Sequence, residues 1–95
     1  MCHVKINSEF INAVASDPAL VPTEKVLYML ICANMEPSGF LRMSFKELAK
    51  KIGYVATYIS ARPLPSLKKN GYIDIFNSKG KVIKPLKYME LLGDE

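Results

Sequence analysis

The sequence has no tryptophan, a single histidine at His3, and only two cysteines, Cys2 and Cys32. Cys2 and His3 are too few for a zinc site, which normally needs a full set of ligands at regular spacing. There is no glycine-rich phosphate loop, the carboxylates are scattered, and hydroxyl side chains such as Thr57 have no histidine nearby in sequence to activate them. We therefore expect neither an enzyme nor a chain that binds a metal or a cofactor.

Long hydrophobic runs are also missing. The longest, at residues 26–33, is interrupted by Tyr28 and is far below the roughly 20 residues of a membrane span. Residues 1–6 lack the basic and apolar regions of a secretory signal. We therefore expect a cytoplasmic chain with no membrane partner, in which Cys32 is a small core residue rather than half of a disulfide.

Charge is distributed unevenly along the 95 residues, which have a formal net charge of +4 and are 49% hydrophobic, enough for one domain with a modest core. Residues 42–87 hold eleven basic side chains against two acidic ones, a net of +9. Residues 1–41 have a net charge of −2, and residues 88–95 one of −3. Positive charge gathered on one part of the chain is typical of a phosphate-binding surface; the alternative is a solvated lysine-rich surface.

The clearest pattern of secondary structure lies in residues 44–76. Ser44 and Glu47 have the spacing of a capping box, which predicts the start of a helix, and Gly53 predicts its end. The apolar residues of this helix recur at helical spacing on one face and are Phe45, Leu48, Ala49 and Ile52. A second helix follows, and its apolar series is Ile59, Leu64 and Leu67. The residues that we expect to be buried together are Leu30, Leu48, Ile59 and Leu67.

A β-hairpin is predicted after Asn70 and Gly71, which end the second helix. Strands at residues 72–76 and 81–86 flank a short turn of sequence Asn-Ser-Lys-Gly. Pro85 cannot donate a hydrogen bond to a neighbouring strand, so it confines the second strand to a sheet edge.

This order of helix, tight turn, helix and hairpin resembles the winged helix-turn-helix family, and within it the small domains of plasmid and phage replication proteins and regulators. The resemblance covers roughly residues 18–84. The residues that carry it are Ser44, Leu48-Ala49, Ile52-Gly53, Ile59, Leu67 and Gly71-Tyr72-Ile73. It implies an α+β fold: a small winged helix-turn-helix domain with three core helices plus a β-hairpin wing.

We expect residues 1–95 to form a single domain. Its parts are an N-terminal extension at 1–17, the helical core leading into the wing at 22–76, the wing hairpin at 72–86 and an acidic tail at 87–95. In the extension, a short strand at residues 4–6 precedes a helix at residues 9–15 that Ser8 caps. The apolar residues that this helix turns inward are Phe10, Ile11 and Val14.

Three further elements complete the expected fold. A central core helix begins at Pro22, because proline suits the first helical position, and it ends near Asn34. Residues 40–43 form a short strand beside the wing. Residues 88–92 add a final helix whose leucines either pack inward or contact a second copy of the chain.

The resemblance implies that the second helix of the pair lies in the major groove of duplex DNA, with the wing on the backbone or in the minor groove. The residues expected to contact DNA are Lys46, Thr57, Tyr58, Ser60, Ala61, Arg62, Lys68, Lys69, Lys79 and Lys81, with Lys50 as a further backbone contact. Lys79 and Lys81 stand at the hairpin tip, where a lysine reaches phosphate rather than a base.

Tyr58 and Arg62 are four residues apart and therefore share one face of the second helix. From there Arg62 can pair with a guanine edge or a phosphate, and Tyr58 can donate to a phosphate. The alternative is that Tyr58 packs on the rim of the core and Arg62 is only solvated. We expect Tyr54 and Val55, in the turn, to be packing residues.

The second helix departs from the family pattern. Ile59 and Leu64 are five residues apart where the family has four, and the extra residue falls in a segment that contains Pro63 and Pro65. Proline inside a helix removes a hydrogen bond and clashes with the preceding turn, at a cost of about 3 kcal/mol. We expect the regular helix to end by Arg62, with Pro65 opening a short last turn. The shortened helix predicts few direct base contacts and modest sequence preference.

Two functions fit these patterns. The first is a DNA-binding regulator or replication accessory protein whose partner is duplex DNA. The second is a protein-interaction module on the same scaffold, in which the proline break forms a surface for a host or replication protein; a purely structural homodimer is a third reading. Salt dependence separates them, because binding by many lysines weakens steeply with salt whereas an apolar contact does not.

Overall fold

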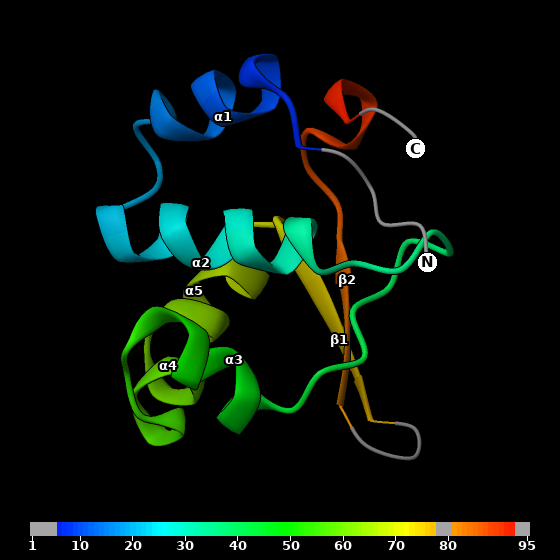
Figure 1. The fold of residues 1–95 in the computed structure, drawn as a ribbon. Coiled ribbons are helices and arrows are strands. Elements are labelled where there is room, and N and C mark those ends of the chain that lie inside the picture. Colours follow the sequence, from blue (N-terminus) through cyan, green and yellow to red (C-terminus); the bar gives the residue numbers. More distant parts are fainter. Residues whose placement is uncertain (1–5, 78–80, 93–95) are drawn as a thin grey trace.

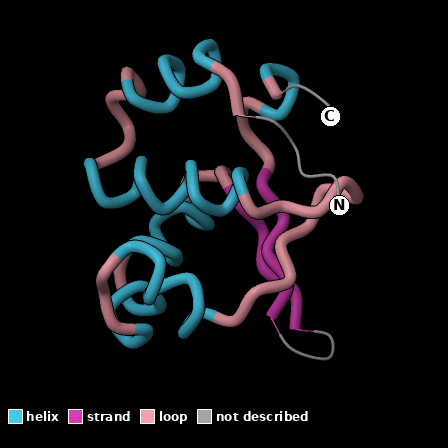
Figure 2. Tube along the Cα trace, in the orientation of Figure 1, coloured by secondary structure: helices cyan, strands magenta, loops and turns pink. Residues whose placement is uncertain are grey.

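The computed structural model describes residues 6–77 and 81–92, without the side chains of Asn77 and Lys81. In chain order the elements are α1 (Ser8–Ala15), α2 (Pro22–Ala33), α3 (Phe45–Ile52), α4 (Ala56–Ala61), α5 (Pro63–Lys69), β1 (Ile73–Asn77), β2 (Lys81–Pro85) and the 3-10 helix η1 (Met89–Leu91). The helices and the antiparallel hairpin form one small α+β domain, as predicted (Figure 2). The expected strand at residues 4–6 lies outside the described residues except for its last residue. Cys2, His3 and the last three residues of the acidic tail also lie outside them.

Helix α2 lies at the centre of the domain, with α1 on one side of it and α3, α4 and α5 on the other (Figure 1). It begins at Pro22 as predicted, and Asn34 is its C-cap. The α2 side chains that are buried in the core are Leu27, Tyr28, Ile31 and Cys32. Leu30 is only half-buried, which corrects the predicted core, because it lies about 100° around the helix from Ile31.

Helix α1 is capped by Asn7 and not by Ser8, which is its first helical residue. Oδ1 of Asn7 accepts a hydrogen bond from the Phe10 N–H at 2.9 Å. Phe10 and Val14 are one turn apart and fully buried, but Ile11 is 42% exposed and was wrongly expected to point inward. Because Ile11 lies about 100° around the helix from Phe10, it misses the face that packs on α2.

Helix α3 begins with the predicted capping box. The Ser44 hydroxyl accepts from the Glu47 N–H at 3.1 Å, and a Glu47 carboxylate oxygen accepts from the Ser44 N–H at 3.4 Å. Gly53 ends the helix in the left-handed conformation, with φ of 78°, which glycine adopts without strain. Leu48 and Ala49 are buried, so α3 packs on the core through the middle of its apolar face.

The predicted break falls between α4 and α5. Arg62 has φ of −124° and ψ of −75°, so it ends α4, and Pro63 is the first residue of α5. The new helix therefore starts at Pro63 and contains Pro65, whereas we expected Pro65 to open it. A single break accommodates both prolines because the first turn of a helix has N–H groups without intrahelical partners, so Pro65 removes no hydrogen bond there.

The hairpin pairs Ile75 with Ile83 at its centre. The strand expected at residues 40–43 is reduced to one bridge, in which the Leu41 N–H donates to the Ile83 carbonyl at 2.8 Å and the Leu41 carbonyl accepts the return bond at 3.0 Å. Strand β1 begins and ends one residue later than predicted, and β2 begins at residue 81 as predicted but ends at Pro85, one residue early. The turn at residues 78–80 lies outside the described residues.

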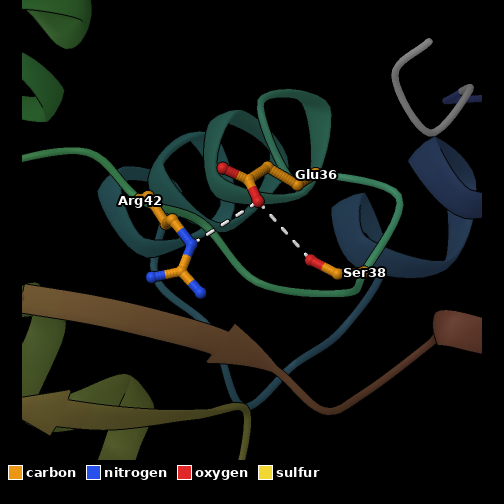
Figure 3. Close-up of polar contacts among 3 residues, drawn as sticks. All are labelled: Glu36, Ser38 and Arg42. Atoms are coloured by element: carbon orange, nitrogen blue, oxygen red, sulfur yellow. Dashed lines mark hydrogen bonds and ion pairs between the residues drawn. The ribbon is translucent and has the colours of Figure 1, made fainter. Parts of the chain in front are cut away.

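The loop between α2 and α3 brings Leu41 to the hairpin. Gly39 turns the chain with φ of 94°, and its N–H donates to the Glu36 carbonyl at 2.8 Å. Glu36 also pairs with Arg42, with Nε and Oε1 3.5 Å apart, and its carboxylate is 3.5 Å from the Ser38 hydroxyl (Figure 3). This is the one ion pair among the described residues, and it closes the loop on itself.

The expected helix at residues 88–92 is shorter than predicted and is the 3-10 helix η1. Leu91, its last residue, and the neighbouring Leu92 are half-buried and pack against the core, which agrees with the inward alternative. The Asn7 side-chain amide donates to the Leu91 carbonyl at 2.7 Å and so joins the two ends of the described chain.

A buried carboxylate that no sequence pattern indicated, Asp17, links the chain just after α1 to the residue before β1 and to the N-cap of η1. One oxygen of Asp17 accepts hydrogen bonds from the hydroxyls of Tyr72, at 2.5 Å, and Tyr88, at 2.7 Å, and the other accepts from the Ala19 N–H at 2.9 Å. Burial by itself raises the pKa of the Asp17 carboxyl, but these hydrogen bonds outweigh it and bring the pKa below its usual value. The ionised form of Asp17 therefore stabilises the fold.

We expect Asp17→Asn to lower the free energy of unfolding by about 1–3 kcal/mol at neutral pH, because the amide oxygen replaces only one of the two accepting oxygens and the NH₂ group in place of the other cannot accept a hydrogen bond. Because the pKa of Asp17 is lower in the folded state, the contribution is complete above its unfolded pKa and is lost as pH falls through the folded value. Denaturant unfolding of both proteins at neutral and acidic pH measures the difference, which should shrink in acid. A difference that stays constant with pH, or one matched by the exposed control Glu9→Gln, contradicts this role.

Candidate nucleic-acid interface

The short connection between α3 and α4 creates an open groove beside it. Lys46 and Lys50 line one side of this groove from α3, and Thr57 lines the other from the first turn of α4. The remaining lining residues are Tyr54, Val55 and Ala56. The structure therefore brings the predicted contacts Lys46 and Thr57 together. Neither Lys46 nor Lys50 has an ion-pair partner among the described residues.

Tyr58 and Arg62 also come together, but in a second hollow on the flank of α4. They face the start of α2, where Val21, Thr23 and Glu24 complete the lining with Pro63 and Ser66 of α5. Both side chains are exposed, Tyr58 by 36%, so Tyr58 lies at the rim of the core and remains accessible. The break between α4 and α5 thus forms one wall of this hollow.

The outward face of α4 is set by Ile59, which is fully buried. At about 100° per residue, Thr57 and Ala61 lie nearly opposite Ile59, and Ser60 lies about 60° around the helix from Thr57. All three are exposed. Because these side chains are small, another molecule that lies against this face can approach the helix backbone closely.

Of the other predicted lysines, only Lys68 and Lys69 have described side chains, and both lie away from these two hollows. Lys68 and Lys69 are exposed in the last turn of α5, where cations interact favourably with the helix dipole, and they line neither hollow. Lys79 lies outside the described residues. Lys81 begins β2 opposite Asn77, and its side chain is not described. The contact of Lys79 and Lys81 with phosphate therefore stays a prediction.

Tyr54 and Val55 were wrongly expected to pack inside. They are 46% and 66% exposed, and the Tyr54 ring lies against the Tyr58 ring with centroids 4.8 Å apart. Val55 is four residues before the buried Ile59, which in a helix would place both on one face. Val55 is instead the N-cap of α4, with an extended backbone at φ of −90° and ψ of 152°, so helical spacing does not apply to it.

The described residues contain no group of three or more histidine, cysteine, aspartate or glutamate side chains that could hold a metal ion. The thiol of Cys32 is fully buried, and burial raises its pKa to about 12, so it stays protonated. No helix in the described part of the chain is long and apolar enough to cross a membrane.

No protein-family model, no curated protein and no solved structure matches this chain. What the chain binds is therefore inferred from the residues of its own surface.

Proposed function

We propose that this protein binds duplex DNA through α4 and the lysines of α3, as a transcription regulator or a replication accessory factor. The observation that carries this proposal is the groove between α3 and α4. There Lys46 and Lys50, exposed and without ion-pair partners among the described residues, stand beside Thr57 at the start of the second helix. Lysines in this arrangement can neutralise phosphates while the helix beside them approaches the base edges.

The order of the elements supports a winged helix-turn-helix arrangement. Helix α3 ends at Ile52, with Gly53 as its C-cap, and α4 begins at Ala56, so a short turn separates the two helices, and α2 packs behind them. The β1–β2 hairpin follows α5 and takes the place of the wing. In such domains the N-terminal part of the second helix reads the bases, and α4 presents Thr57 there.

The length of α4 limits what it can read. Its six residues extend about 9 Å along the helix axis, less than two turns. The small side chains of Thr57, Ser60 and Ala61 allow close approach but offer few groups for base recognition. Binding is therefore mainly electrostatic, with modest sequence preference.

Salt-titrated binding of the unmodified protein to random duplex DNA tests this function. The logarithm of the association constant should fall linearly with the logarithm of salt concentration, with a slope of about −0.9 for each phosphate neutralised, and we expect a slope of about −3 or steeper. Absence of binding at low salt, or an affinity independent of salt, contradicts duplex DNA as the ligand.

Arg62→Ala tests the expectation of modest sequence preference. Arg62 lies at the end of α4 on its flank, so we expect its loss to weaken binding to all duplexes by a similar factor. Affinities for a selected site and for random DNA, measured at one salt concentration, give the comparison. If the variant loses discrimination and keeps its non-specific affinity, then the short helix does read bases through Arg62.

A further inference from the structure

Exposed apolar side chains gather on one surface that runs from the start of α2 across the turn between α3 and α4. Five of the eight large hydrophobic residues that are exposed in the described part of the chain belong to it, with exposed fractions from 36% to 66%. They are Val21, Val26, Tyr54, Val55 and Tyr58, and we call them the apolar strip. An exposed apolar patch of this kind is characteristic of an interaction site.

Three neighbouring hollows connect the members of the apolar strip. The first, beside the break between α4 and α5, is lined in part by Thr23 and Tyr58. The second shares Thr23 and adds Val26 and Tyr54. The third shares Tyr54 and adds Val55. The apolar strip is therefore continuous, with hollows that can receive protruding side chains.

Basic side chains border the apolar strip at both ends. Lys46 and Lys50 line the third hollow, and Arg62 lines the first. The carboxylates of Glu24 and Glu47, on α2 and α3, each accept a hydrogen bond from a backbone N–H at the start of their own helix. Both carboxylates keep their negative charge, and Glu24 lines the first hollow beside Arg62, but three basic side chains against two acidic ones leave the border with a net positive charge.

We propose that the apolar strip is a docking site for an acidic amphipathic segment of a partner protein. Apolar side chains at helical spacing would enter the three hollows, while carboxylates beside them would face Lys46, Lys50 and Arg62. A second copy of this chain fits less well, because a two-fold interface here would set the same basic border against itself. Duplex DNA, proposed above to contact Lys46 and Lys50, leaves the apolar strip itself unexplained, since its aliphatic side chains do not bind phosphate.

A defined peptide tests this docking site. The probe is a labelled synthetic helix of about 18 residues, or five turns, with leucines along one face and glutamates on the other. A matched peptide has lysine in place of every glutamate. Because the border is basic, the glutamate peptide should bind at least about tenfold more tightly than the lysine peptide.

Two double variants locate the binding. Tyr54→Ser with Val55→Ser should weaken binding of the glutamate peptide at least about tenfold. Ile11→Ser with Leu86→Ser is the matched control, because these residues are 42% and 45% exposed and lie outside the apolar strip. The control should change peptide affinity by less than about twofold, since surface substitutions away from a site have small effects. Circular dichroism verifies that both variants fold.

Four results overturn the proposal: no binding of the glutamate peptide, equal binding of both peptides, equal effects of the two double variants, and a dimer in sedimentation that the Tyr54–Val55 variant abolishes. The last result would assign the apolar strip to a second copy of the chain. Peptide binding does not require DNA binding, so the two proposals fail separately. If the Tyr54–Val55 variant weakens duplex binding while the peptide does not bind, the strip belongs to the DNA surface.

Discussion

Replacing Leu48 by alanine should lower the free energy of unfolding by about 2–5 kcal/mol. Leu48 is fully buried in the core cluster that also contains Ile59 and Leu67, and it anchors α3 against its neighbours. The substitution removes buried methyl groups and leaves a cavity that the surrounding helices fill only in part. Urea denaturation of the wild type and the variant, analysed with a common slope, measures the difference.

Val55→Ala is the control for this prediction. Val55 is 66% exposed, so its truncation should change the free energy of unfolding by less than about 0.5 kcal/mol. A loss near zero for Leu48→Ala, or equal losses for the two variants, would show that α3 does not pack on the core through Leu48.

Replacing both Lys46 and Lys50 by alanine should reduce the slope of the salt dependence of DNA binding by about two units, one for each phosphate that the protein no longer neutralises. Because lysine binds phosphate and not a specific base, affinity should fall by a similar factor for every duplex tested. Fluorescence anisotropy with several labelled duplexes over a range of salt concentrations provides both quantities.

Lys25→Ala is the matched control for the lysine pair. The Lys25 ammonium donates to the Ala15 carbonyl at 2.5 Å and lies on α2, outside the groove between α3 and α4. Its replacement should leave the slope unchanged. If the double variant keeps the full slope, or if Lys25→Ala lowers it equally, the groove is not where phosphates bind.

Local signals in the sequence predicted most of the helical part of the fold. The capping box of Ser44 and Glu47, the stop at Gly53 and the break at Arg62 are each specified by a few neighbouring residues, and the structure confirms all three. The same kind of signal was ambiguous for α1, where Asn7 and Ser8 are both good N-caps and only the structure shows which one is used.

Long-range contacts could not be predicted in this way. The hydrogen bonds of Asp17 to Tyr72 and Tyr88 join residues that are 55 and 71 positions apart, and no spacing rule links them. The exposure of Tyr54 and Val55 was also missed, because it depends on how α3 and α4 meet and not on the composition of the turn. For the candidate site, the sequence therefore predicted the lysines and the residues of α4. It did not predict the exposed apolar residues Tyr54 and Val55.

The most direct test of the α3–α4 surface is a titration of the ¹⁵N-labelled protein with a short duplex at low salt, followed through its backbone amide resonances. We predict that the largest chemical-shift changes fall in residues 46–62, which include most of α3, the turn and α4. The amides of α1 (Ser8–Ala15), on the opposite side of α2, should remain unchanged. Changes concentrated on α1, or spectra that do not respond to duplex DNA, would contradict DNA binding by this surface.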